Sequence, residues 1–177
     1  LKFLYFWSIH KNKYNMPLIT SVRGKKPTIH QNVFIADNAT IIGDVCIGSE
    51  SSIWYNAVLR GDVNKIKIGK RVNVQDGAII HCTYKKSSTV IANNVTVGHN
   101  AILHGCIIQN NVLVGMGAII MDNAIIESNT IIAAGSIVPA GKLIKSNSIY
   151  KGIPAKRFKS LDKIEADAAA KKKKAQD

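Results

Sequence analysis

Aliphatic residues recur every six positions along most of this 177-residue chain. The run starts at Ile35 and continues to Val138, with a nine-residue step from Leu59 to Ile68, a break after Ile80 and a five-residue step from Leu103 to Ile108. Four residues after each aliphatic stands a small or β-branched residue. These are Ala39, Val45, Ser51, Ala57, Val63, Val72, Ala78, Val95, Ala101, Ile107, Val112, Ala118, Ala124, Thr130 and Ser136. A period of six fits neither an α-helix nor a simple strand, whose side chains repeat every 3.6 and 2 residues. It is typical of a triangular coil with the aliphatic pointing inward and the small residue near each corner.

The sequence therefore predicts an all-β fold, a left-handed parallel β-helix of hexapeptide repeats over residues 17–150. Short strands of a β-sandwich are the alternative, but they recur at about 8–12 residues with variable loops. Glycine and asparagine, which tolerate left-handed backbone, mark the expected turns at Asn38, Gly43, Gly48, Gly69, Asn94, Asn100, Asn123 and Asn129. The repeat is interrupted at Cys82–Thr89, where we expect a protruding loop.

The two ends of the chain depart from the repeat. Met16-Pro17-Leu18 resembles a natural start, so residues 1–16 are expected to be an extension outside the fold. After the β-helix, an apolar stripe at helical spacing predicts a C-terminal α-helix packed along the prism within residues 151–177. The stripe consists of Phe158, Leu161, Ile164 and Ala168. The Lys171–Lys174 run reads as a solvated basic tail.

Charge and cysteines restrict the partners and the compartment. The formal net charge is +13, but residues 27–150 hold nine basic and seven acidic residues, so the excess is mostly terminal. No basic stretch interleaved with aromatic residues indicates nucleic-acid binding. The apolar Leu1–Trp7 segment is too short to span a membrane. Three cysteines without the spacing of a disulfide scaffold favour a reducing compartment, and we expect a cytoplasmic protein.

Three of the five histidines, His81, His99 and His104, lie in the repeats beside the interruption. Three imidazoles with one open position are typical of a catalytic zinc site, and they also suit Fe²⁺. His81 and His104 each follow an inward aliphatic, so they should leave the prism in the same direction on neighbouring rungs. His99 comes two places after Val97 and should point elsewhere. We therefore expect one metal ion to be shared between subunits of a homotrimer, a closed assembly with equivalent interfaces.

Polar residues near these histidines are candidates for supporting roles. Arg60 is expected to pair with Asp62 or Asp76, within or between subunits. The carboxylates are candidates to orient the imidazoles, and Gln75 is a candidate to hydrogen-bond a metal-bound water. Cys82 and Cys106 adjoin the histidines, but buried structural thiols are the favoured interpretation.

These residues lie in segments that resemble the gamma-class carbonic anhydrase family over about residues 17–160. The matching segments are Arg60-Gly61-Asp62, residues 73–77 (NVQDG), His81, residues 97–106 (VGHNAILHGC), residues 115–118 (GMGA) and residues 150–156 (YKGIPAK). The resemblance implies a homotrimer that hydrates CO₂ to bicarbonate, with His81 and His104 from one chain and His99 from the next. It also implies an interface ion pair of Arg60 with Asp76, and places Gln75 and Tyr150 near the substrate.

The chain departs from the fastest type in this family, which has an acidic loop and a glutamate that shuttles protons. Here Val63 follows Asp62, and the loop Thr83–Ser88 carries Lys85 and Lys86 but no acid. Hydration is therefore expected to be slow, absent or dependent on another shuttle. Two other functions remain open. One is an acyl-CoA-dependent acyltransferase, which needs a single histidine base. The other is a non-catalytic trimeric metal-binding scaffold.

Overall fold

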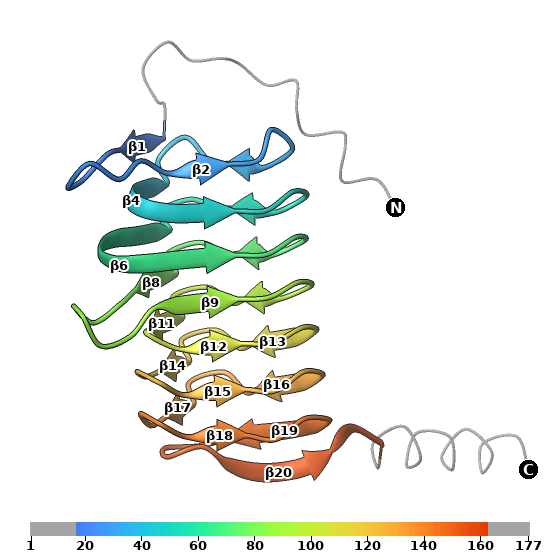
Figure 1. Cartoon of the computed structure of the whole chain (residues 1–177). Coiled ribbons are helices and arrows are strands. Elements are labelled where there is room, and N and C mark those ends of the chain that lie inside the picture. Colours follow the sequence, from blue (N-terminus) through green and yellow to red (C-terminus); the bar gives the residue numbers. More distant parts are fainter. Residues whose placement is uncertain (1–16, 163–177) are drawn as a thin grey trace, which may run out of the picture.

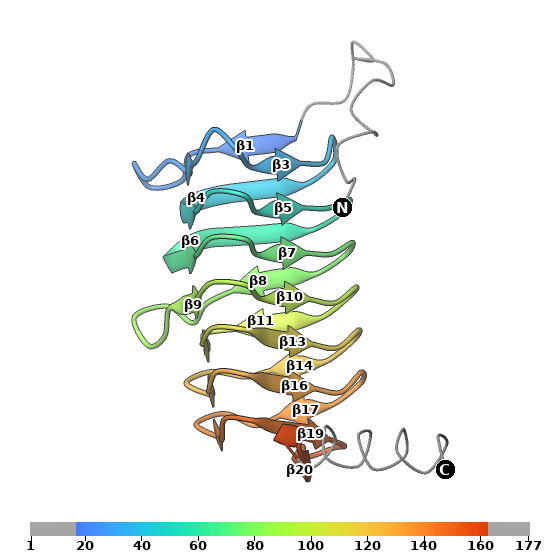
Figure 2. The same ribbon diagram turned by 90° about the vertical axis from the view of Figure 1, so that its right-hand side faces the viewer.

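The computed structural model describes residues 17–162, which form a parallel β-helix (Figure 1). Each coil contributes one segment to each of three faces, and strands pair in parallel with those one coil before and after. The predicted all-β parallel β-helix is confirmed. Figure 2 shows the coils stacked into a column from β1 at one end to β20 at the other.

The strands are grouped by the face on which they lie. Face 1 contains β1 (Leu18–Thr20), β8 (Ile79–His81), β11 (Ile102–His104), β14 (Ile119–Ile120) and β17 (Ile137–Val138). Face 2 contains β2 (Thr28–Ile29), β9 (Thr89–Ile91), β12 (Ile107–Ile108), β15 (Ile125–Ile126) and β18 (Leu143–Ile144). The long strands β4 (Thr40–Ile47) and β6 (Val58–Ile68) run through faces 1 and 2. Face 3 contains β3 (Phe34–Ile35), β5 (Ser52–Ile53), β7 (Asn73–Val74), β10 (Thr96–Val97), β13 (Val112–Val114), β16 (Thr130–Ile132), β19 (Ser148–Lys151) and β20 (Lys156–Ser160).

The core is a continuous column of the repeated aliphatic side chains. On face 1 the column stacks one residue per rung in register, and all of its members are fully buried: Ile41, Leu59, Ile80, Leu103 and Ile120. Burial of these side chains is the main favourable term that holds the coils together. The column also fixes the direction of the next residue in each strand, because successive side chains point to opposite faces of a strand.

Two of the predicted corner residues are wrong. Ile107 is 41% exposed, and Cys106 occupies the buried corner position instead. Val63 is only partly buried, and Ile66 is fully buried in its place. Both errors have one cause: the corner residue stands two places before the next inward aliphatic, here Ile108 and Ile68. Counting forward from the previous aliphatic fails wherever the step between aliphatics differs from six.

The turns contain the expected left-handed residues at Gly43, Asn94, Asn100, Asn123 and Asn129. Asparagines at one corner also form a ladder, in which Asn94 donates to Asn111 and Asn111 donates to Asn129. The predicted left-handed backbone is wrong at Asn38, Gly48 and Gly69, which are absent from the positive-φ residues. Gly48 is needed for a different reason, because a Cβ there would lie 2.6 Å from the carbonyl oxygen of Gly69.

The C-terminal part of the described chain is a strand at Phe158, where a helix was predicted. Residues Lys156–Ser160 form β20, which pairs antiparallel with β19, so Phe158 lies on a strand and is half exposed. Pairing with the exposed edge of the last coil overrides the helical spacing of the apolar residues. Ile164, Ala168 and the Lys171–Lys174 run lie outside the described residues, as does the proposed extension 1–16. Among residues 17–162, no helix has the length and apolar content required to cross a membrane.

Candidate metal centre

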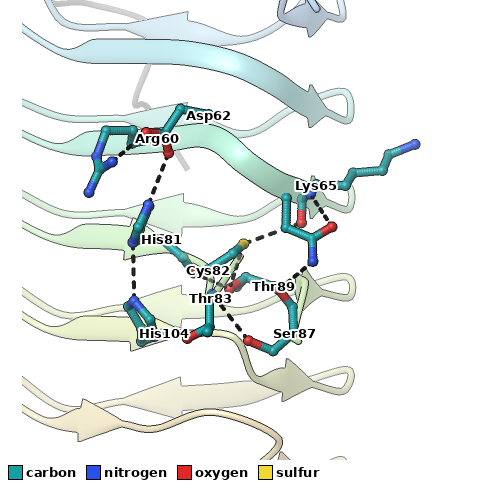
Figure 3. A network of polar contacts seen from close by, with 10 residues as sticks. Arg60, Asp62, Lys65, His81, Cys82, Thr83, Ser87, Thr89 and His104 are labelled. Carbon is teal, nitrogen blue, oxygen red and sulfur yellow. Dashed lines mark hydrogen bonds and ion pairs between the residues drawn. The ribbon is translucent and has the colours of Figure 1, made fainter. Parts of the chain in front are cut away.

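His81 and His104 lie side by side on the outer surface of face 1. They are register partners at the ends of β8 and β11, each directly after a buried aliphatic. His81 Nδ1 lies 3.1 Å from His104 Nε2, and the two side chains are 16% and 33% exposed. The phase of the repeat predicts this arrangement. Figure 3 shows the two rings pointing toward each other, so two ring nitrogens meet at one point of this surface.

Asp62 and Arg60 continue this line of polar side chains on the preceding coil. Asp62 Oδ1 lies 3.0 Å from His81 Nε2, and Arg60 donates a hydrogen bond to Asp62 Oδ2. Gly61 lies between them, and a side chain at this position would clash with the preceding coil, because a Cβ there would lie 2.6 Å from the carbonyl oxygen of Asp44. Burial opposes ionisation of Asp62, but the hydrogen bonds with His81 and Arg60 outweigh it and lower the pKa of the carboxyl. Asp62 is thus an anion that faces His81.

On the other side, Asp122 faces His104. Its Oδ2 lies 3.1 Å from His104 Nδ1, and its Oδ1 accepts a hydrogen bond from the Ser87 hydroxyl. Burial again opposes ionisation, but hydrogen bonds with Ser87, Thr83 and His104 lower the pKa of Asp122. Each histidine of the pair therefore has a carboxylate on the ring nitrogen that faces away from the shared contact.

His99 and Asp76 form a separate pair. His99 lies in the turn between β10 and β11, where its Nδ1 is 3.0 Å from Asp76 Oδ2. Both side chains are more than 40% exposed, and Gln75 directly precedes Asp76 in the chain. Within one chain, residues 17–162 contain no group of three histidine, cysteine or acidic side chains able to hold a metal ion. One chain thus brings His81 and His104 together and leaves His99 apart.

The other candidates, Arg60, Asp76 and Tyr150, have partners outside the histidine pair. Within the chain, Arg60 pairs with Asp62, whereas Asp76 pairs with His99. Tyr150 lies on β19 of face 3, buried in the hydrophobic core of the last coil, and its hydroxyl accepts a hydrogen bond from the Lys145 amide. The chain therefore does not bring Tyr150 to the histidine pair.

Cys82 and Cys106 are both buried behind the histidines, and burial raises the pKa of both thiols. Metals and thiol reagents react with the thiolate, so these two buried residues are poor metal ligands.

We expect Ellman's reagent at about pH 8 to react rapidly with one thiol per native chain, Cys46, which is partly exposed. The Cys46→Ser variant should show no rapid phase, and denaturant should release all remaining thiols. Rapid reaction of Cys82 or Cys106 in the native protein would contradict this assignment.

Two residues of the site, Asp122 and Ser87, escaped the sequence analysis. A signal for Asp122 was present, because a full coil is 18 residues and Asp122 stands 18 residues after His104. Ser87 offered no such signal, because it lies in the connection that interrupts the repeat.

The comparison with known proteins places this chain in a family. Residues 26–61 and 105–140 match the model of the bacterial transferase hexapeptide (six repeats). A carbonic anhydrase of Geobacillus kaustophilus is 53% identical over 144 residues, which are 81% of this chain and 79% of that protein. Gamma carbonic anhydrase 2, mitochondrial, of Arabidopsis thaliana is 43% identical over 148 residues, 81% of this chain and 53% of that protein. The chain belongs to the gamma-class carbonic anhydrase family.

This gamma-class chain also resembles a solved structure named for a different activity. A hexapeptide transferase family protein from Anaplasma phagocytophilum is 46% identical, with a TM-score of 0.78. The similarity covers 81% of this chain and 84% of that one. The fold is thus shared between proteins named as anhydrases and as transferases, and the function must be argued from the site.

Proposed function

We propose that this protein is a gamma-type carbonic anhydrase-like metalloenzyme that hydrates CO₂ to bicarbonate. The observation that carries the proposal is the His81–His104 pair, whose ring nitrogens lie 3.1 Å apart with a carboxylate behind each ring. Carboxylate–imidazole pairs are the usual support of histidine metal ligands, since they fix ring orientation and raise ligand basicity. An acyltransferase needs only one histidine as a base and leaves this doubly supported pair unexplained.

The donor set suits Zn²⁺ or Fe²⁺. His81 and His104 of one chain and His99 of a neighbouring chain would supply three imidazole nitrogens, and a catalytic site of this kind keeps one position open. A bound metal of this type lowers the pKa of a water ligand to about 7 and so supplies a hydroxide nucleophile at neutral pH.

The surface around the pair supports assembly into a homotrimer. Outward positions of face 1 beside the histidines are apolar, and Ile79 and Met121 are 41% and 42% exposed. Ile102 and Ile119 follow Ile79 in register on the next two rungs, and Met121 stands two residues after Ile119. Contiguous apolar surface of this kind marks a protein–protein contact. A second copy would cover it, and a cyclic threefold arrangement would give every chain the same contact.

The residues around the histidine pair are better suited to orienting the metal ligands than to transferring protons. Asp62 and Asp122 have lowered pKa values, so at neutral pH they are weak bases that orient the imidazoles. Gln75 provides an uncharged amide beside Asp76, and we assign it to hydrogen bonding of water or substrate. Val63 stands where the fast members of the family have a glutamate, and the loop Thr83–Ser88 contains no acid. Proton release to an external buffer is therefore expected to limit turnover.

Stopped-flow CO₂ hydration by the metal-loaded protein, prepared without oxygen, tests this proposal. We expect catalysis above the uncatalysed rate that increases with the concentration of imidazole buffer and disappears on chelation. A metal-loaded trimer that is inactive at every buffer concentration would instead support the non-catalytic scaffold. Metal-independent consumption of acetyl-CoA with an amine or alcohol acceptor would support the transferase, the activity for which the Anaplasma phagocytophilum protein is named.

A further inference from the structure

The Asp122 carboxylate is held on two sides. One oxygen, Oδ2, faces His104 Nδ1, and the other, Oδ1, accepts the Ser87 hydroxyl hydrogen bond. Its side chain is 29% exposed, so water can reach it, but the contacts with His104, Ser87 and Thr83 leave it little freedom to rotate. A carboxylate fixed in this way presents a constant acceptor to the histidine ring.

Ser87 is itself fixed, although it belongs to the loop that projects from the prism. Ser87 as a whole residue is 5% exposed, and its hydroxyl accepts a hydrogen bond from the Thr83 amide. Its backbone carbonyl accepts a hydrogen bond from Asn64 Nδ2 on β6. The loop between β8 and β9 is thus anchored at the residue that contacts Asp122.

The backbone between the two residues is shaped to admit them. Gly105 follows His104 and has a φ of 58°. A Cβ at this position would collide with both the Ser87 hydroxyl and Asp122 Oδ1. The position therefore has room for the Ser87–Asp122 contact only while residue 105 has no side chain.

We propose that Ser87 and Asp122 are positioning residues that hold the ring proton of His104 on Nδ1, leaving Nε2 free to bind a cation. The reason is that the hydrogen bond made by one imidazole nitrogen decides which nitrogen is the donor to a metal. His104 Nε2 is the nitrogen that faces His81. The inference rests on the proposed metal site and adds to it a role for the protruding loop.

Titration of the metal-free, full-length protein with Co²⁺, followed by visible absorption, tests the role of the carboxylate. Asp122→Ala is expected to raise the Co²⁺ dissociation constant about 10–100-fold. Asp122→Asn should give a smaller increase, because its amide oxygen can still accept from Nδ1–H. Ser87→Ala should weaken binding in the wild-type background and have no further effect in Asp122→Ala, since the two residues act as one unit.

Glu127→Ala is the matched control. Glu127 is 26% exposed, accepts a hydrogen bond from the Ser146 amide and forms an ion pair with Lys145, not with a histidine. Its loss should leave the Co²⁺ affinity unchanged. Thermal unfolding of each variant reports any general loss of structure.

Nitrogen-15 NMR of the histidine rings in the metal-free protein gives a second readout. His104 is expected to carry its proton on Nδ1, and Asp122→Ala is expected to lose this preference. Wild-type Co²⁺ affinity in Asp122→Ala, or a His104 proton on Nε2 in the wild type, would overturn the inference. If the wild-type protein bound no Co²⁺, the proposed function would fail, and the NMR measurement alone would decide the positioning role.

Discussion

Replacement of His99 by alanine is expected to remove the metal from the purified protein. Elemental analysis should show a fall from about one ion per chain to near zero, because a three-histidine site loses one of its three protein ligands. CO₂ hydration should fall to the uncatalysed rate. The exposed His30, which lies in an early turn outside the site, provides the control, and His30→Ala should retain both metal and activity.

A metal site contained within a single chain would not lose its metal when His99 is replaced. His99 contacts Asp76, on the turn of the preceding coil, whereas His81 and His104 contact each other on face 1. If each chain held a metal by itself, His99→Ala would leave the metal content unchanged. Retention of stoichiometric metal in His99→Ala would therefore contradict a site shared between subunits.

Gly43→Ala is expected to destabilise the protein by about 2–5 kcal/mol, the largest stability effect that we predict. Gly43 has a φ of 78°, where an L-residue is strained. A Cβ would also lie 2.8 Å from the carbonyl carbon of Gly61 and 3.2 Å from the Asp62 amide nitrogen. Because these are backbone atoms of the next coil, the coil must move, and the Asp62–His81 contact with it.

Gly141→Ala separates the two causes. Gly141 has a φ of 69°, but its Cβ position has no neighbour within 4 Å. This variant should lose only the backbone term, about 1–2 kcal/mol. Urea unfolding at equal protein concentrations gives both values, since the stability of the proposed trimer depends on concentration. Equal losses of unfolding free energy in the two variants would show that the close approach of the next coil to Gly43 adds nothing to the cost of the Gly43→Ala substitution.

The sequence was sufficient to predict the β-helix because one period governs burial in every coil. The phase of that period also placed His81 and His104 on one surface, and both lie there. It failed where the period changed: Cys106 and Ile66 took the corners expected for Ile107 and Val63. Phe158 was misplaced because pairing with the edge of β19, a tertiary contact, determined the structure of its segment.

The candidate site was less predictable than the fold. The separation between His99 and the other two histidines followed from their phase, but the partners of the carboxylates did not. Arg60 was equally compatible with Asp62 and Asp76, and only the strand geometry of β6 selects Asp62 within the chain. Ser87 reaches Asp122 through a loop whose path no repeat specifies. Tyr150, expected near the substrate, fills the next inward position of the repeat after Ile144.

Mixed trimers test the shared site most directly. Differently tagged His81→Ala and His99→Ala chains would be refolded together, and trimers containing both would be isolated and analysed for metal. At one interface of such a trimer, the intact His81 and His104 of one chain meet the intact His99 of the other. We predict that mixed trimers regain metal and CO₂ hydration while each variant alone has neither. Mixed trimers as empty as the two parents would contradict the assignment of these three histidines to one metal across a subunit interface.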